Sequence, residues 1–143
     1  MPFEPGLAIV NRSRATTLAD HVEVATSFWA RARGLIGRES LPDGFALIIR
    51  PCGAIHMLMV RVPLDVLHID KRNRVVKILS IKPWRLGPVV PQSRWVIELP
   101  VGTALRTATR VGDVVDVIPA AATIATQTAP GHIPPRDATR RVP

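Results

Sequence analysis

The stretch PLDVLHIDKRNRVVKILSI, residues 63–81, predicts a β-hairpin around which the rest of the fold can be placed. Its halves, 63–70 and 74–81, are rich in Val, Ile and Leu, and the polar KRN between them is typical of a turn. Alternation puts Asp65 and His68 on opposite faces of the first strand, and both faces also carry apolar residues. We therefore expect a central strand buried on both sides. Asp65 must then have hydrogen-bond partners, because an unpaired buried carboxylate is very costly.

Short strands are predicted on both sides of this hairpin by the same hydrophobic pattern. The predicted strands are 7–11, 18–25, 45–50 and 94–100, and the stretch 111–119 is predicted to open with a Gly-Asp turn and close with a strand. Capping residues and glycines predict short helices at 26–38 and 101–108. Many short strands with two short helices predict a β-dominated α+β domain, a small antiparallel barrel or sandwich of about seven short strands.

Composition divides the 143-residue chain near residue 118. Residues 1–118 have enough apolar side chains for a single globular domain. Residues 119–143 are rich in Ala, Thr and Pro and poor in large apolar groups, which predicts a disordered tail. The first residues do not resemble a signal peptide, and no run reaches the roughly 18 apolar residues of a membrane span. We expect a cytoplasmic protein that does not depend on a disulfide, since it has one cysteine.

The formal net charge of +8 points to an anionic partner such as nucleic acid or acidic lipid. Most of the 19 cationic residues are arginine, however, and Ala, Val and Pro are also abundant, a mixture typical of a GC-rich genome. The arginines are scattered along the sequence, and no phosphate-binding loop or dinucleotide motif is present. Nucleic-acid binding is therefore disfavoured.

Residues 51–70 combine reactive side chains with a mostly apolar sequence. They include Cys52, the only cysteine, together with His56 and Asp65. Glu98 lies just before a predicted helix and could accept hydrogen bonds from the free N–H groups at its start. We treat Cys52, His56, Asp65 and Glu98 as candidates that either line a pocket or form a structural polar cluster.

The chemistry open to these candidates is limited. Cys52 and His56 have the spacing of half a zinc site, but there is no second close pair, so we predict no metal and no cofactor. A nucleophilic Cys52 with His56 as its base would need an orienting group and an oxyanion hole, and the sequence marks neither. For Asp65 a structural role is favoured over a catalytic one. Asp70, at the start of the predicted turn, is expected to hydrogen-bond its own backbone.

Several motifs occur in an order and spacing that resemble a known family. They are VATSFWARARGLIGR (24–38), LPDGFALIIRPCGAIHMLMVRVPLDVLHID (41–70), VVKILSIKPW (75–84), VIELPVG (96–102) and VGDVV (111–115). Over about residues 7–118 they are similar to the mostly prokaryotic family catalogued as domain of unknown function 192. The resemblance implies a β-rich fold and no particular activity, and we expect a bacterial protein.

Three functions remain open from the sequence. We favour a non-enzymatic binding or accessory module with an unknown protein or small-molecule partner. The first alternative is an enzyme that uses His56 as a general base oriented by Asp65 in a pocket. The second is a weak nucleic-acid binder driven by its arginines. Exposure of His56 in a pocket would favour the enzyme, and a continuous arginine face would favour nucleic acid.

Overall fold

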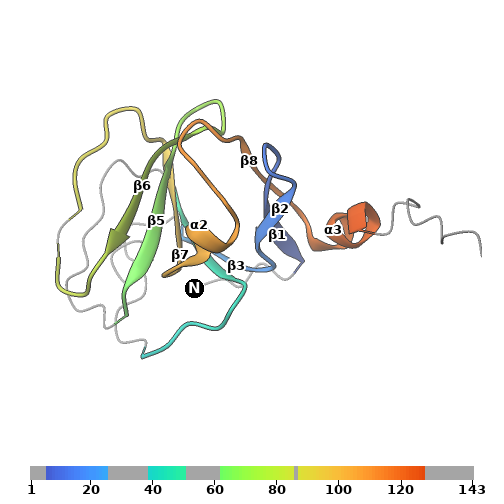
Figure 1. Ribbon diagram of the computed structural model, residues 1–143, viewed down its shortest axis with the longest axis horizontal. Helices are drawn as coiled ribbons and strands as arrows, with labels where there is room; N and C mark the ends of the chain where they lie inside the picture. The colour runs from blue at the N-terminus through green and yellow to red at the C-terminus, as the bar shows by residue number, and fades with distance from the viewer. Residues whose placement is uncertain (1–5, 26–38, 51–61, 86, 128–143) are drawn as a thin grey trace, which may run out of the picture.

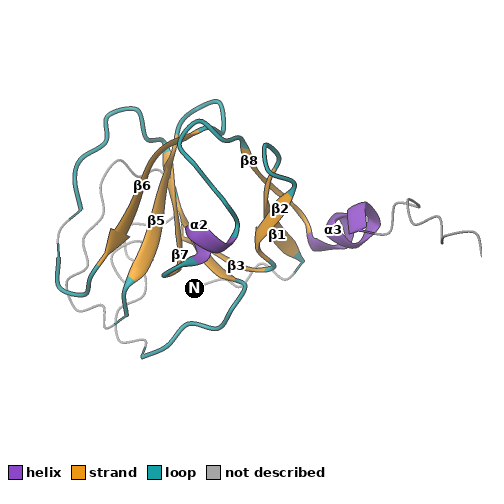
Figure 2. Ribbon diagram, in the orientation of Figure 1, coloured by secondary structure: helices purple, strands orange, loops and turns teal. Residues whose placement is uncertain are grey.

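The computed structural model describes residues 6–25, 39–50, 62–85 and 87–127. Eight strands in this part of the chain form two sheets, shown in Figures 1 and 2. The larger sheet has five strands in the order β3-β4-β7-β5-β6. Their bounds are β3 His21–Ala25, β4 Phe45–Ile49, β5 Leu64–Ile69, β6 Val75–Ile81 and β7 Trp95–Pro100.

Strand β5 lies inside the larger sheet, and all six of its residues are buried, which confirms the prediction of a central strand. The predicted hairpin is also confirmed, because β5 and β6 pair antiparallel. In the turn between them Asp70 Oδ1 accepts hydrogen bonds from the backbone N–H groups of Arg72 at 2.8 Å and Arg74 at 2.9 Å. Asp70 therefore binds its own backbone, as expected for a turn aspartate.

The smaller sheet has three antiparallel strands in the order β2-β1-β8. They are β1 Leu7–Asn11, β2 Thr16–Ala19 and β8 Val115–Pro119. The prediction of one strand over 18–25 was wrong, because the chain leaves the smaller sheet at Asp20 and enters the larger one as β3. At this point the backbone N–H groups of Asp20 and His21 both donate to the carbonyl of Gly44. Alternation alone does not reveal such a change of sheet.

The pairing also differs from the expected all-antiparallel arrangement. Strands β3 and β4 are parallel, whereas the other pairs in the larger sheet are antiparallel. Among the described strands no barrel closes, because β3 and β6 are the outer strands of the larger sheet and β2 and β8 those of the smaller one. The β-dominated class with short helices is confirmed.

Two short helices occur in the described ranges. Helix α2, Thr103–Arg106, lies within the predicted helix 101–108. Helix α3, Ala120–Gln127, lies in the segment predicted to be disordered, so that prediction does not hold for these eight residues. The three consecutive alanines that open α3 have the highest helix propensity, which explains the difference. The helix predicted at 26–38 falls outside the described residues.

Buried apolar residues form two clusters, one on each face of the larger sheet. The first includes side chains from both sheets, among them Ile9 of β1, Ile48 of β4 and Ile97 of β7. The second includes Phe45 and Leu47 of β4 with residues of β5, β6 and β7 on the opposite face. None of the described helices is long and apolar enough to span a membrane.

Candidate functional site

Asp65 on β5 is 2% exposed, and both of its carboxylate oxygens accept a hydrogen bond. The hydroxyl of Ser80 on β6 donates to Oδ1 at 2.8 Å. The backbone N–H of Ala104 in α2 donates to Oδ2 at 2.9 Å. Asp65 therefore ties β5 to its neighbouring strand and to the first turn of a helix 39 residues along the chain.

Glu98 on β7 is also buried, but it lies on the other face of the sheet. Glu98 is paired across from Val66, and Asp65 is paired across from Leu99. Residues directly opposite in a sheet project to the same face, and successive residues project to opposite faces. Glu98 and Asp65 therefore do not line one pocket. The N–H at the start of α2 donates to Asp65 and not to Glu98, the acceptor suggested by sequence proximity.

The other two sequence candidates, Cys52 and His56, lie outside the described residues. The contact between His56 and Asp65 that the enzyme alternative requires therefore falls outside the described residues. Within the described ranges no group of three or more His, Cys, Asp or Glu side chains could hold a metal ion.

His68 on β5 forms a buried polar chain that the sequence did not reveal. Its Nδ1 lies 3.0 Å from the Ser93 hydroxyl, which in turn donates to the Trp95 carbonyl at 3.2 Å. Because the hydroxyl proton is used on Trp95, Nδ1 of His68 carries the proton donated to Ser93. Burial, with a smaller contribution from Lys77, lowers the pKa of His68, so the ring is neutral near pH 7. Its Nε2 is buried and has no hydrogen-bond partner among the described residues.

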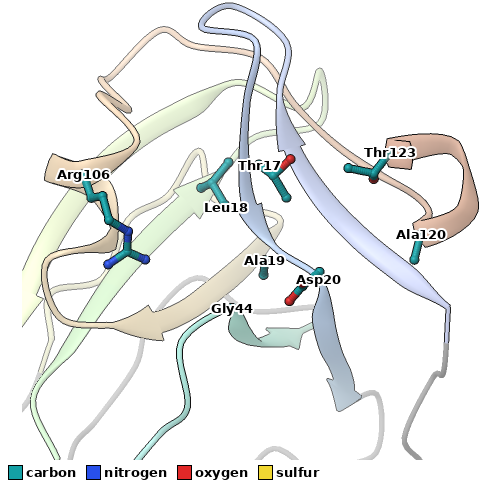
Figure 3. Close-up of a pocket in the computed structure, with 8 residues that line it drawn as sticks. All are labelled: Thr17, Leu18, Ala19, Asp20, Gly44, Arg106, Ala120 and Thr123. Atoms are coloured by element: carbon teal, nitrogen blue, oxygen red, sulfur yellow. The ribbon is translucent and has the colours of Figure 1, made fainter. Parts of the chain in front are cut away.

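A hollow of about 510 Å³ lies where the two sheets and both helices approach one another (Figure 3). Three residues of β2 and Asp20 form one wall, and Gly44 lies beside them. Arg106 of α2 projects from the opposite side, and α3 contributes Ala120 and Thr123. The hollow is therefore built from segments that are distant in sequence.

Asp20 and Arg106 give this hollow one charge of each sign. Both residues are exposed, and neither side chain makes a hydrogen bond or ion pair with the described part of the chain. Gly44 leaves room for the Asp20 carboxylate, because a Cβ at Gly44 would collide with it. Gly44 also has φ +80°, a conformation that favours glycine. Sequence reasoning missed this site because isolated Asp and Arg residues carry no motif.

Comparison with known proteins gives a family match over most of the domain. A family model described as "Uncharacterized ACR", domain of unknown function 192, matches residues 9–117. A UPF0127 protein of Pyrococcus abyssi is 32% identical over 116 residues, which cover 77% of this chain and 97% of the relative. A UPF0127 protein of Pyrococcus horikoshii is 32% identical over 108 residues, which cover 73% of this chain and 94% of the relative. Both are archaeal, so they do not support the expected bacterial source.

A solved structure shares the fold. The crystal structure of a protein of unknown function from Novosphingobium aromaticivorans superposes with a TM-score of 0.67. The two chains are 24% identical, and the match covers 78% of this chain and 83% of the other. At this identity the likeness shows the fold alone.

Proposed function

Because the chain belongs to the domain of unknown function 192 family, whose proteins are uncharacterised, we propose its function from its own surface: it is a non-enzymatic binding module for a small zwitterionic molecule. The ligand occupies the hollow between Asp20 and Arg106 (Figure 3). We place this module in the cytoplasm as part of the same proposal.

The observation that carries the proposal is that two opposite charges, neither of them paired with a described residue, lie on facing sides of one hollow. A guanidinium binds a carboxylate through two parallel hydrogen bonds, and a carboxylate binds an ammonium group. Ala120 adds a partly exposed apolar side chain to the lining, whereas Leu18 and Ala19 of β2 are buried beneath it. The volume is within the usual range of small-molecule sites. A free amino acid or short peptide combines the required charges with a small apolar body.

The hydrogen bonds of Asp65 give it a structural role. Both of its oxygens accept a bond, from Ser80 on β6 and from the Ala104 N–H in α2, so the carboxylate joins three elements of the fold. We propose that Asp65 is a structural anchor, and that the candidate set Cys52, His56, Asp65 and Glu98 supports the fold.

Peptides of increasing length test the binding function. L-alanine, dialanine and trialanine would be titrated into the labelled full chain while NMR shifts are followed for residues that line the hollow. We expect one length to bind best, because it matches the separation of the two charges. Acetylation of its amine or amidation of its carboxylate should each weaken binding by about 10- to 150-fold, since hydrogen bonds to charged groups contribute roughly 1.5–3 kcal/mol.

Matched variants identify the groups responsible. Arg106→Gln should abolish the difference in affinity between the free and the amidated peptide. Asp20→Asn should abolish the difference in affinity between the free and the acetylated peptide. Arg85→Gln removes an exposed arginine that does not line the hollow, so it should leave both differences intact. Shifts confined to other surfaces, or equal binding of the blocked peptides, would contradict the proposal.

A further inference from the structure

Three turns that are far apart in sequence converge at one end of the molecule, at the top of Figure 1. They are the β1–β2 turn, the β5–β6 turn and the loop between α2 and β8. The backbone N–H of Arg12 donates to the Val114 carbonyl at 2.9 Å, and that of Val115 donates to the Asn73 carbonyl at 2.9 Å. These main-chain bonds hold the turns in fixed positions, so the side chains they carry form one surface.

This surface, which we call the basic end, has a surplus of positive charge. Its cationic residues are Arg12, Arg14, Lys71, Arg72, Arg74, Arg94 and Arg110, and its carboxylates are Asp70, Asp113 and Asp116. Seven cations face three carboxylates, so four of the eight surplus charges of the chain lie here.

The three carboxylates are already engaged. Asp113 accepts hydrogen bonds from Asn11, Arg14 and the backbone of Arg110. Asp116 pairs with the Arg12 guanidinium and also accepts a bond from Asn73.

The remaining cations make no close ion pair with a carboxylate in the described part of the chain, although the charges of Arg72 and Arg74 contribute to the lowered pKa of Asp70. Asp70 is used by the backbone N–H groups of its own turn. The side chains of Lys71, Arg72 and Arg74 make no ion pair with any described residue, and Arg94 bonds only the Pro91 carbonyl. The structure thus fixes the turn backbone while leaving these charges available.

The unpaired cations line a groove. Two adjoining hollows of about 280 and 420 Å³ share the residues Asp70, Arg74 and Gln92. The first hollow is lined by all four cations, Lys71, Arg72, Arg74 and Arg94. The second extends the groove past Val75 and Val76 of β6 to Gly112. The groove therefore gathers four cations in its first hollow and continues past Arg74 into a second hollow that carries one cation and one carboxylate.

We propose that this groove binds the phosphodiester backbone of nucleic acid without reading its sequence. Arginine presents a planar fork that matches phosphate oxygens, and a chain of phosphates matches a series of cations along a groove. No lining residue of either hollow is aromatic, so there is no platform on which bases could stack. The lining includes three valines, of which Val111 is exposed, but it has no Leu, Phe or Trp side chain of the kind that inserts into a membrane, which favours nucleic acid over a lipid surface. This surface shares no residue with the hollow of Figure 3.

The dependence of affinity on salt tests the proposal directly. A labelled 20-nucleotide duplex and the matching single strands, DNA and RNA, would be titrated with the full chain at several salt concentrations. For about four phosphate contacts on duplex, affinity should fall roughly 100-fold between 50 and 200 mM salt. Unrelated sequences of equal length should bind alike, because the groove contacts only the backbone.

Two double variants of equal net charge distinguish phosphate binding in the groove from a general effect of the protein's net charge. Arg72→Gln with Arg74→Gln should lower the slope of log affinity against log salt by about two, one for each lost phosphate contact. Lys82→Gln with Arg85→Gln removes the same charge from the loop after β6 and should leave the slope unchanged. Circular dichroism would establish that both variants fold.

Three outcomes would overturn the proposal. One is no binding at 50 mM salt and micromolar protein. Another is an equal loss of slope in the two double variants, which would leave net charge as the only cause. The third is binding of phosphatidylserine vesicles, but not of oligonucleotides, that depends on Arg72 and Arg74.

Discussion

Asp65→Ala should destabilise the fold by removing the acceptor for two donors of different exposure. The Ala104 N–H is in the buried core, where an unsatisfied donor costs roughly 1–3 kcal/mol. Ser80 is exposed, so its hydroxyl can bond water instead and adds little. Loss of a buried, hydrogen-bonded side chain adds to this, and we expect a total of about 2–4 kcal/mol. A domain with about 5–15 kcal/mol of stability would still fold.

Asp65→Asn separates hydrogen bonding from charge. The amide oxygen can accept from Ala104, and the amide NH₂ can donate to the Ser80 oxygen, so both contacts survive. We expect a loss of about 1 kcal/mol, from the weaker bond to a neutral acceptor. Ser80→Ala should cost less than 1 kcal/mol because its partner Asp65 keeps the bond from Ala104.

Urea unfolding at pH 7, monitored by circular dichroism, measures these differences in the free energy of unfolding. They appear as shifts of the urea midpoint while the slope of free energy against urea concentration stays constant. Asp43→Ala is the matched control, since Asp43 is exposed and should change stability by no more than about 0.5 kcal/mol. The reasoning fails if Asp65→Ala unfolds at the wild-type midpoint. It also fails if Asp65→Asn costs as much as Asp65→Ala, because hydrogen-bond geometry would then not be the source of the effect.

Three further outcomes follow from buried or strained groups. Because the pKa of His68 is lowered in the folded state, its neutral form contributes fully to stability above its unfolded pKa near 6.5, and this contribution is lost as pH falls through the folded pKa. The melting temperature of the protein should therefore fall between pH 7 and 5. That fall should be less steep in His68→Asn. Asp113→Ala should cost about 3 kcal/mol in urea unfolding, because it strands the buried amide of Asn11 together with an arginine, and a cost below 1 kcal/mol would contradict this. Gly44→Ala should cost more stability than Gly102→Ala, since both glycines have positive φ but of these two only at Gly44 would a Cβ meet another group, the Asp20 carboxylate. Equal melting temperatures of the two variants would show that the collision is relieved at no cost.

Strand positions could be predicted from the sequence because burial on a sheet imposes a local pattern. The hairpin of β5 and β6 and the burial of β5 on both faces followed from alternation between residues 63 and 81. The change of sheet at Asp20 did not, because a strand that moves between sheets keeps the same alternation. The parallel pairing of β3 with β4 was equally hidden, since pairing direction depends on the path of the intervening chain.

The polar sites depended on contacts between distant segments, which no local pattern encodes. The buried position expected for Asp65 required hydrogen-bond partners, but one of them, the Ala104 N–H, comes from 39 residues away. Glu98 was placed near that same helix start, and the register turns its side chain to the other face. The groove was missed for a similar reason. Arginines that are scattered in the sequence come together only when the turns that carry them are joined by main-chain bonds.

The pairing of β1 with β8 has a consequence for the order in which the protein is made. Asn11 at the end of β1 bonds Asp113 just before β8, across 102 residues of chain. At a synthesis rate of about 5–20 residues per second, β1 and β2 wait roughly 5–20 seconds for the strand that completes their sheet. During that interval one edge of β1 is open to pairing with another chain. A ribosome that pauses anywhere between the end of β2 and the start of β8 would prolong this exposure, so misassembly of the nascent protein should depend on translation speed over that stretch of the message.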